Sequence, residues 1–199
     1  MSVPTNTPQT PQAWHARKDV RIGAVAVVAV IAAVVIAIVL GNGGAKTTGS
    51  TSTTDPGVML IYPVLLTQAE LETRIRDLNQ TVYWIGPVKG DNYELTRTTT
   101  NNVFIRYLPK DVPVNGEPGR HLVIGTYPYR DALNALKASG TGTPITLTST
   151  PPGIAVVDTK TPTNVRVAFK GLDFQIDVYD PKAADALKYA TSADLVPVR

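Results

Sequence analysis

Residues 93–108, YELTRTTTNNVFIRYL, decide how the folded part of this chain is built. Apolar and polar side chains alternate in 93–98 and again in 103–108, which is the period of a strand with one buried face. Asn101 and Asn102 stand between the two runs, and asparagine tolerates the backbone of tight turns. The stretch therefore predicts two neighbouring strands joined by a short turn.

Further strand-like runs flank this stretch, separated by turn residues such as Gly, Pro and Asn. They lie at residues 83–85, 122–127, 145–148, 154–157, 165–169 and 174–179. Apolar residues at helical spacing predict three short helices. These lie at 67–78, 129–139 and 182–193, the first opened by a capping box of Thr67 and Glu70. Connections between the strands are too short for helical crossovers, so we expect an α+β fold with mostly antiparallel pairing.

A strand-like run that ends in Tyr and Pro precedes each predicted helix. The pairs are Tyr62-Pro63 and Tyr127-Pro128, and Tyr179 is followed by Pro181 after one residue. This recurrence predicts an internal duplication of a unit with one helix and four strands, with copies at 63–127 and 128–180. We expect both copies to lie in one domain, residues 58–199, which is near the modal size of a single domain.

The segment before this domain has a different composition. Residues 22–40 are Ala, Val, Ile or Leu apart from Gly23, and as a helix they would span about 28 Å, close to the hydrocarbon core of a bilayer. They predict a transmembrane helix. Residues 41–57 are rich in Gly, Ser and Thr, which is typical of a flexible linker. Residues 1–21 form a polar, Pro-containing tail that we expect to be disordered.

The flanks of residues 22–40 predict the orientation in the membrane. Arg17, Lys18 and Arg21 precede the segment, so the positive-inside rule places the N-terminus in the cytoplasm and the domain outside. A cleaved signal peptide is the alternative, although its apolar region would be unusually long. Within the segment, the small residues Ala29, Ala33 and Ala37 recur every fourth position, a stripe that would let two copies pack as a homodimer.

The composition excludes several kinds of chemistry. The chain has no Cys, so it has neither a disulfide nor a thiolate nucleophile. His121 is the only histidine after the apolar segment, which leaves no two-histidine metal site and no spare imidazole as a base. Of the 19 basic and 16 acidic residues, three basic and one acidic lie in residues 1–21, so the remaining 16 and 15 nearly balance and give no electrostatic surface for nucleic acid. We expect no cofactor and no enzymatic activity.

Two groups of side chains need a choice between a structural and a binding role. Asp173, Gln175 and Asp177 resemble the start of a calcium loop, but the required Gly and distant Glu are missing, so we expect a solvated strand face. Four aromatic residues are the candidate ligand-binding side chains, since stacked rings can bind a glycan or a Pro-rich peptide. They are Tyr83, Trp84, Tyr93 and Tyr107, for which core packing is the alternative.

The run YWIGP at 83–87, with YELTRT at 93–98 and VFIRYLP at 103–109, resembles segments of uncharacterised single-pass bacterial envelope proteins. The resemblance covers residues 82–109 and implies a cell-envelope location, but no activity. The hypothesis from the sequence is a membrane-tethered, extracytoplasmic binding module with a protein or envelope-polymer partner. An envelope hydrolase without Cys or metal, and a structural subunit of an envelope complex, are the alternatives.

Overall fold

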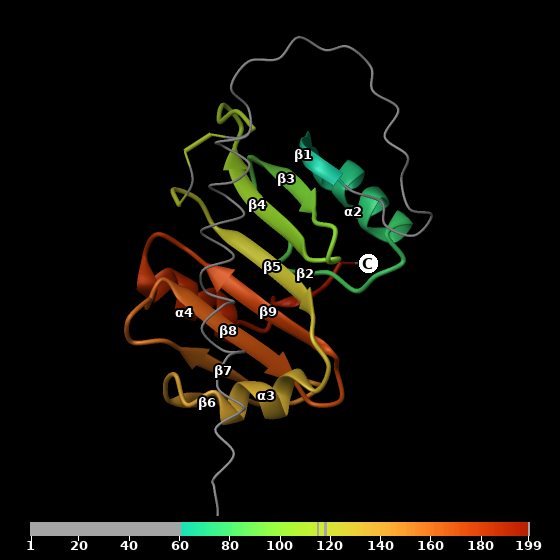
Figure 1. The fold of residues 1–199 in the computed structure, drawn as a ribbon. Helices are drawn as coiled ribbons and strands as arrows, with labels where there is room; N and C mark the ends of the chain where they lie inside the picture. The colour runs from blue at the N-terminus through green and yellow to red at the C-terminus, as the bar shows by residue number, and fades with distance from the viewer. Residues whose placement is uncertain (1–60, 115, 118, 199) are drawn as a thin grey trace, which may run out of the picture.

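A computed structural model describes residues 61–114, 116–117 and 119–198. Their main element is an eight-stranded antiparallel sheet in the order β1-β3-β4-β5-β9-β8-β7-β6 (Figure 1). The strands of this sheet are β1 (Ile61–Leu66), β3 (Asp91–Arg97), β4 (Val103–Pro109), β5 (Val123–Pro128), β6 (Pro144–Leu147), β7 (Gly153–Val157), β8 (Asn164–Phe169) and β9 (Phe174–Tyr179). A second, two-stranded sheet pairs β2 (Tyr83–Trp84) with β10 (Val196–Pro197).

The hairpin of β3 and β4 confirms the expectation from residues 93–108. Its strands pair in continuous register from Asp91 with Pro109 to Arg97 with Val103. Asn101 has a positive φ of 62° in the connecting turn, a conformation that asparagine adopts more readily than most residues. The backbone N–H of Asn101 donates to the carbonyl of Thr98 and closes the turn. Local turn chemistry and strand alternation therefore agree at this hairpin.

Three short helices accompany the sheet: α2 (Gln68–Asp77), α3 (Ala132–Ala138) and α4 (Ala183–Thr191). The predicted capping box is confirmed at α2, where the Thr67 hydroxyl accepts from the Glu70 N–H and the Glu70 carboxylate accepts from the Thr67 N–H. The Glu70 carboxylate accepts from both the N–H and the hydroxyl of Thr67, and these two hydrogen bonds lower its pKa. Figure 1 shows α2 beside β1 and β3, and α3 near β7 and β8.

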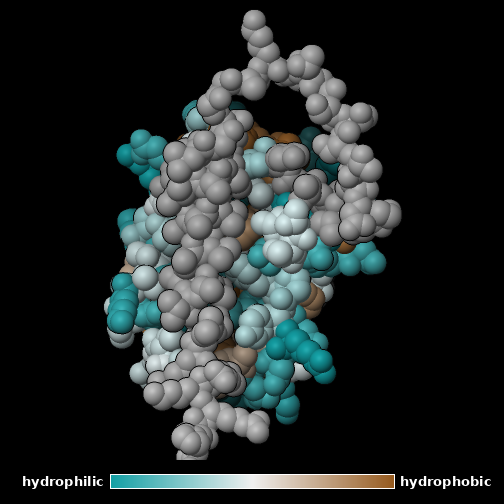
Figure 2. Space-filling view, in the orientation of Figure 1, coloured by the Kyte–Doolittle hydropathy of each residue, from teal (hydrophilic) through white to brown (hydrophobic). Residues whose placement is uncertain are grey.

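The two faces of the large sheet are covered by different elements. Strand β7 shows the division, because Ala155 packs into the main core with α2, α4 and β2, whereas its neighbours Ile154 and Val156 pack against Leu136 of α3. Alternate residues of a strand point to opposite faces, so α3 lies on the face opposite α2 and α4. On the described surface shown in Figure 2, hydrophobic residues form small separate patches.

The predicted fold class is wrong, because it included a transmembrane helix. Across the described ranges no helix is long and apolar enough to cross a membrane. The longest of them, α2, has 10 residues and spans about 15 Å, half the thickness of bilayer hydrocarbon. The described residues form a mostly antiparallel β-sheet domain with a few short helices. The description of the protein as single-pass and signal-anchored is corrected with it. Residues 1–21, 22–40 and 41–57, which held the predicted tail, membrane segment and linker, lie outside the described residues.

The arrangement of strands also differs from a unit of one helix and four strands. In the part of the chain that the structure describes, β2 pairs with β10 alone, a two-residue strand that alternation could not predict, and β1 takes the place beside β3. Pro63 lies within β1 instead of after it. The helices otherwise follow their strands as expected, since α3 comes after β5 and α4 after β9. The duplication of residues 63–127 and 128–180 stays a prediction.

Candidate functional site

The four aromatic candidates lie in the main core. Tyr83, Trp84, Tyr93 and Tyr107 are 1–6% exposed. The ring centroids of Tyr93 and Tyr107 are 5.2 Å apart and nearly perpendicular, and that of Trp84 lies 6.2 Å from Tyr93. Such edge contacts are typical of aromatic cores. The rings of Trp84 in β2, Tyr93 in β3 and Tyr107 in β4 therefore form one cluster.

Hydrogen bonds made by the hydroxyls explain why Tyr93 and Tyr107 of this cluster are tyrosines. The Tyr107 hydroxyl accepts from the Ile85 N–H at 3.0 Å and donates to the Gly86 carbonyl at 3.2 Å, so it satisfies the backbone after β2. The Tyr93 hydroxyl accepts from the Val88 N–H at 3.1 Å. Burial raises the pKa of both phenols, so both remain protonated near neutral pH. These side chains hold the segment after β2 in place.

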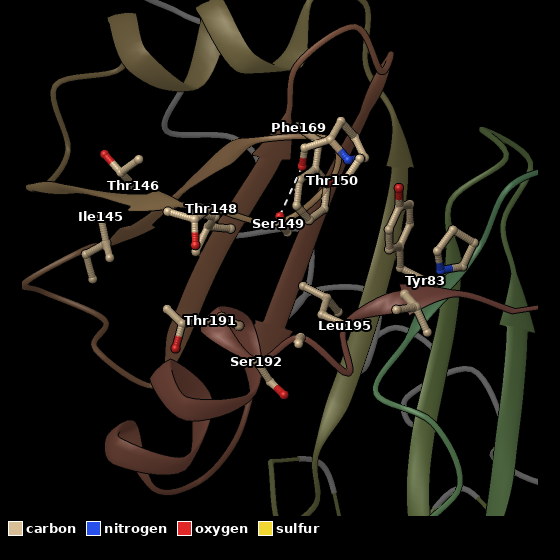
Figure 3. Close-up of a pocket in the computed structure, with 16 residues that line it drawn as sticks. Tyr83, Ile145, Thr146, Thr148, Ser149, Thr150, Phe169, Thr191, Ser192 and Leu195 are labelled. Carbon is tan, nitrogen blue, oxygen red and sulfur yellow. Dashed lines mark hydrogen bonds between the residues drawn. The ribbon is translucent and has the colours of Figure 1, made fainter.

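Tyr83 differs from the other three because it reaches a groove. Its ring stacks on Phe169 with centroids 5.6 Å apart and planes 20° from parallel. Both residues line a groove of about 630 Å³ that also contacts the end of α4, the strands β6 and β10, and the turn after β6 (Figure 3). The volume lies within the range of small-ligand sites. Burial raises the pKa of the Tyr83 phenol, which keeps it protonated as a hydrogen-bond donor.

Hydroxyl groups dominate the polar part of the groove, and charge is missing from it. No Lys, Arg, His, Asp or Glu is among the 16 described residues that line it. The apolar lining includes Leu147, Leu195 and Val196. The hydroxyl residues of the lining, besides Tyr83, are Thr146, Thr148, Ser149, Thr150, Thr191 and Ser192.

Some of these hydroxyls already donate a hydrogen bond within the protein. Thr191 donates to the Leu187 carbonyl at 2.8 Å and Ser192 to the Asp194 carboxylate at 2.9 Å. Each can still accept a hydrogen bond through a free lone pair. Thr148 and Thr150 have no side-chain hydrogen bond to any described residue, so they can both donate and accept. The groove therefore offers donors and acceptors without charge.

The polar face of β9 is buried rather than solvated, which corrects the expectation for Asp173, Gln175 and Asp177. Asp173 is exposed, but Gln175 is 7% exposed and Asp177 is fully buried. Gln175 donates to the Asp177 carboxylate at 2.8 Å, and Arg166 of β8 is the residue opposite Asp177 in the register of the two strands. In the described ranges no group of three His, Cys, Asp or Glu side chains could hold a metal ion.

The covering of that face explains the difference. Helix α3 packs over β7 and β8, and the segment after β4 contacts the same face near β4 and β9. The Gly116 carbonyl accepts from Arg106, and the Gly119 carbonyl accepts from the Tyr179 hydroxyl at 2.8 Å. Neither contact can be seen in strand alternation, because both depend on a loop folding back over the sheet.

Comparisons of the chain with protein-family models, with curated proteins and with solved structures find no match. The groove must therefore be interpreted from its own chemistry. Sequence reasoning missed it, because its walls come from separate segments, of which 145–148 was assigned to a strand and 190–193 to a helix end. The available signal was the run from residue 138 to 157, which contains no charged residue.

Proposed function

We propose that this domain is a binding module, without catalytic chemistry of its own, whose groove takes an uncharged ligand. The observation that carries the proposal is the composition of the lining: hydroxyl side chains around the stacked rings of Tyr83 and Phe169, with no charged residue. A charged ligand group would lose water here without gaining a counter-charge, which is costly. A neutral polar ligand instead exchanges its hydrogen bonds to water for hydrogen bonds to the donors and acceptors of the groove.

The composition of the groove favours binding over hydrolysis. A Ser or Thr nucleophile needs a neighbouring base to accept its proton. Among the hydroxyls of the groove, Ser192 comes nearest to a nucleophile beside a base, because it donates to the Asp194 carboxylate. The Asp194 N–H donates back to the same hydroxyl at 3.0 Å. These are the hydrogen bonds of a local turn after α4, and no His or Lys lines the groove. An extracytoplasmic location, and a protein or envelope-polymer partner, stay predictions from the sequence.

The test is to fill the groove and measure binding. Thr148 is an exposed lining residue, so Thr148→Trp should occupy the groove without disturbing the core. Thr159→Trp is the matched control, since Thr159 is also exposed but lies after β7, at the opposite end of that strand from the groove. The full chain and both variants are applied to an array of neutral glycans and uncharged peptides.

We expect at least one class on the array to bind the unaltered chain and the control variant, and to bind Thr148→Trp about tenfold more weakly or worse. If nothing neutral is bound, or if Thr148→Trp binds like the unaltered chain, the groove is not the binding site. Turnover of a glycan or peptide on the same array would favour the hydrolase instead.

A further inference from the structure

The two edges of the large sheet differ in how they are protected against further pairing. Strand β1 contains Pro63 and an irregular register between Ile61 and Val64, and both features hinder an added strand. Within the described residues, strand β6 at the other edge pairs with β7 alone, in a regular register. It carries none of the charged side chains that protect many edge strands, and its proline, Pro144, stands at the first position of the strand and not inside it. Strand β6 is thus the receptive edge.

Pro144 identifies the backbone groups that β6 leaves free. Pro144 pairs with Val156 but has no N–H, so this pair must be one without mutual hydrogen bonds. Pairs alternate along an antiparallel ladder, which makes Ile145 with Ala155 a hydrogen-bonded pair and Thr146 with Ile154 a pair without hydrogen bonds. The N–H and carbonyl of Thr146 therefore point away from β7, toward the open edge.

A strand added beside β6 would place alternate side chains on the face of the sheet where the groove lies. Ile145 and Leu147 pair with Ala155 and Gly153, and Leu147 packs into the main core on the α4 side. Figure 3 shows Ile145 pointing away from Thr146. Ile145 is 36% exposed, so its apolar side chain is available to a strand added beside β6. Alternate side chains of an added strand would lie beside Ile145 and over the groove.

We propose that β6 binds an extended, uncharged peptide segment as an additional strand, with one of its side chains in the groove. This inference rests on the proposed binding function and specifies its ligand class. The backbone groups of Thr146 bind the peptide main chain, while the hydroxyls of the groove and Ile145 select neutral, β-branched or small apolar side chains. A second copy of the chain is a poorer occupant, because four strand residues, about 13 Å, supply far less area than a stable dimer needs.

The experiment measures binding of a defined probe to the full chain. The probe is an uncharged heptapeptide of alternating Thr and Val, capped at both ends. Two further probes carry N-methyl groups on alternate residues, one on the Thr set and the other on the Val set. Because the N–H groups of a strand point alternately to its two sides, only one of these peptides loses the donors that face β6. On the protein, Thr146→Pro removes the outward N–H and the Thr146 hydroxyl but leaves the bonds to β7 intact, and Thr146→Val, which removes the hydroxyl alone, is its control.

We expect the unmethylated probe to bind, one N-methylated probe to bind about tenfold more weakly than the other, and Thr146→Pro to lose binding with an unchanged circular dichroism spectrum. The unequal effect of the two N-methylated probes needs no change in the protein, so it does not depend on the folding of a variant.

Other outcomes overturn this proposal in distinguishable ways. Equal binding of both N-methylated probes would mean recognition by side chains alone. Binding of neutral glycans but of no peptide would remove the peptide and leave the groove as a binding site. Self-association of the chain that Thr146→Pro abolishes would make a second copy the occupant. Failure of every glycan and peptide would remove the proposed function together with this inference.

Discussion

Asp177 provides a quantitative test of how completely the sheet face opposite the main core is buried. Its carboxyl is fully buried on β9 between Gly125 and Arg166, and burial raises its pKa from 3.8 to about 6. The hydrogen bond from Gln175 and the charge of Arg166 oppose this rise only in part. Each unit of pKa corresponds to about 1.4 kcal/mol, so ionisation of Asp177 costs the folded state about 3 kcal/mol.

The sign of the pH dependence follows from comparing the two states. An unfolded aspartate has a pKa of about 3.9, so the folded protein binds this proton more tightly than the unfolded chain does. Folding therefore takes up a proton between about pH 4 and pH 6, and the free energy of unfolding falls as the pH rises through that window. The contribution of the protonated carboxyl is fully present below about pH 4 and is lost above about pH 6.

The assay compares urea unfolding of the full chain and of Asp177→Asn from pH 4 to pH 8, followed by far-ultraviolet circular dichroism. Other groups titrate in both proteins, so the difference between them isolates Asp177. The unaltered chain should lose about 3 kcal/mol relative to Asp177→Asn over that range. Asp173→Asn, an exposed position just before β9, is the control that should keep the slope of the unaltered chain. A difference that does not change with pH would refute the burial of this carboxylate.

Three further predictions concern the core and the ends of elements, each measured by urea unfolding of the full chain. Trp84→Ala should cost about 3–5 kcal/mol, because the indole is 6% exposed and packs against Tyr93; a folded variant of normal stability would contradict a core role. Gly153→Ala should cost about 1–3 kcal/mol, since the new Cβ would lie 2.5 Å from the Ala168 carbonyl oxygen; an unchanged midpoint would mean that β7 and β8 separate easily. Thr67→Ala should cost about 1 kcal/mol through the lost cap of α2, and Thr73→Ala, on the exposed side of the same helix, should have a smaller effect.

The strands were predictable where the local sequence alone specifies them. Strands β3 and β4 combine alternation with an Asn turn, and both lie within a residue or two of the predicted ranges. The same reasoning misjudged β9, because alternation distinguishes two faces but does not show whether the polar face is solvated. The face of the sheet that carries Asp177 is covered in part by α3, over β7 and β8, and by the loop after β4, and such long-range contacts leave no local periodicity.

The candidate site was beyond prediction for a related reason. Of the four aromatic candidates, only Tyr83 lines the groove, because the side chains of Trp84, Tyr93 and Tyr107 are buried in the core away from it. The choice was based on residue type, and large aromatic side chains bury more area in a core than on a surface. The groove instead uses small hydroxyl residues, which are common in turns and give no distinctive sequence pattern.

By itself, the sequence determined where most of the strands and the three helices of the described residues form, through alternation, helical spacing and caps, and its lack of Cys excluded disulfides. It also placed an uncharged run at residues 138–157. Only the tertiary structure decided that β6 is an unprotected edge, that β2 leaves the large sheet to pair with β10, and that the turn after β6 meets the end of α4 at a groove. The physical reason is that elements form from interactions between near neighbours, whereas edges, covered faces and grooves arise from contacts between segments far apart in the chain.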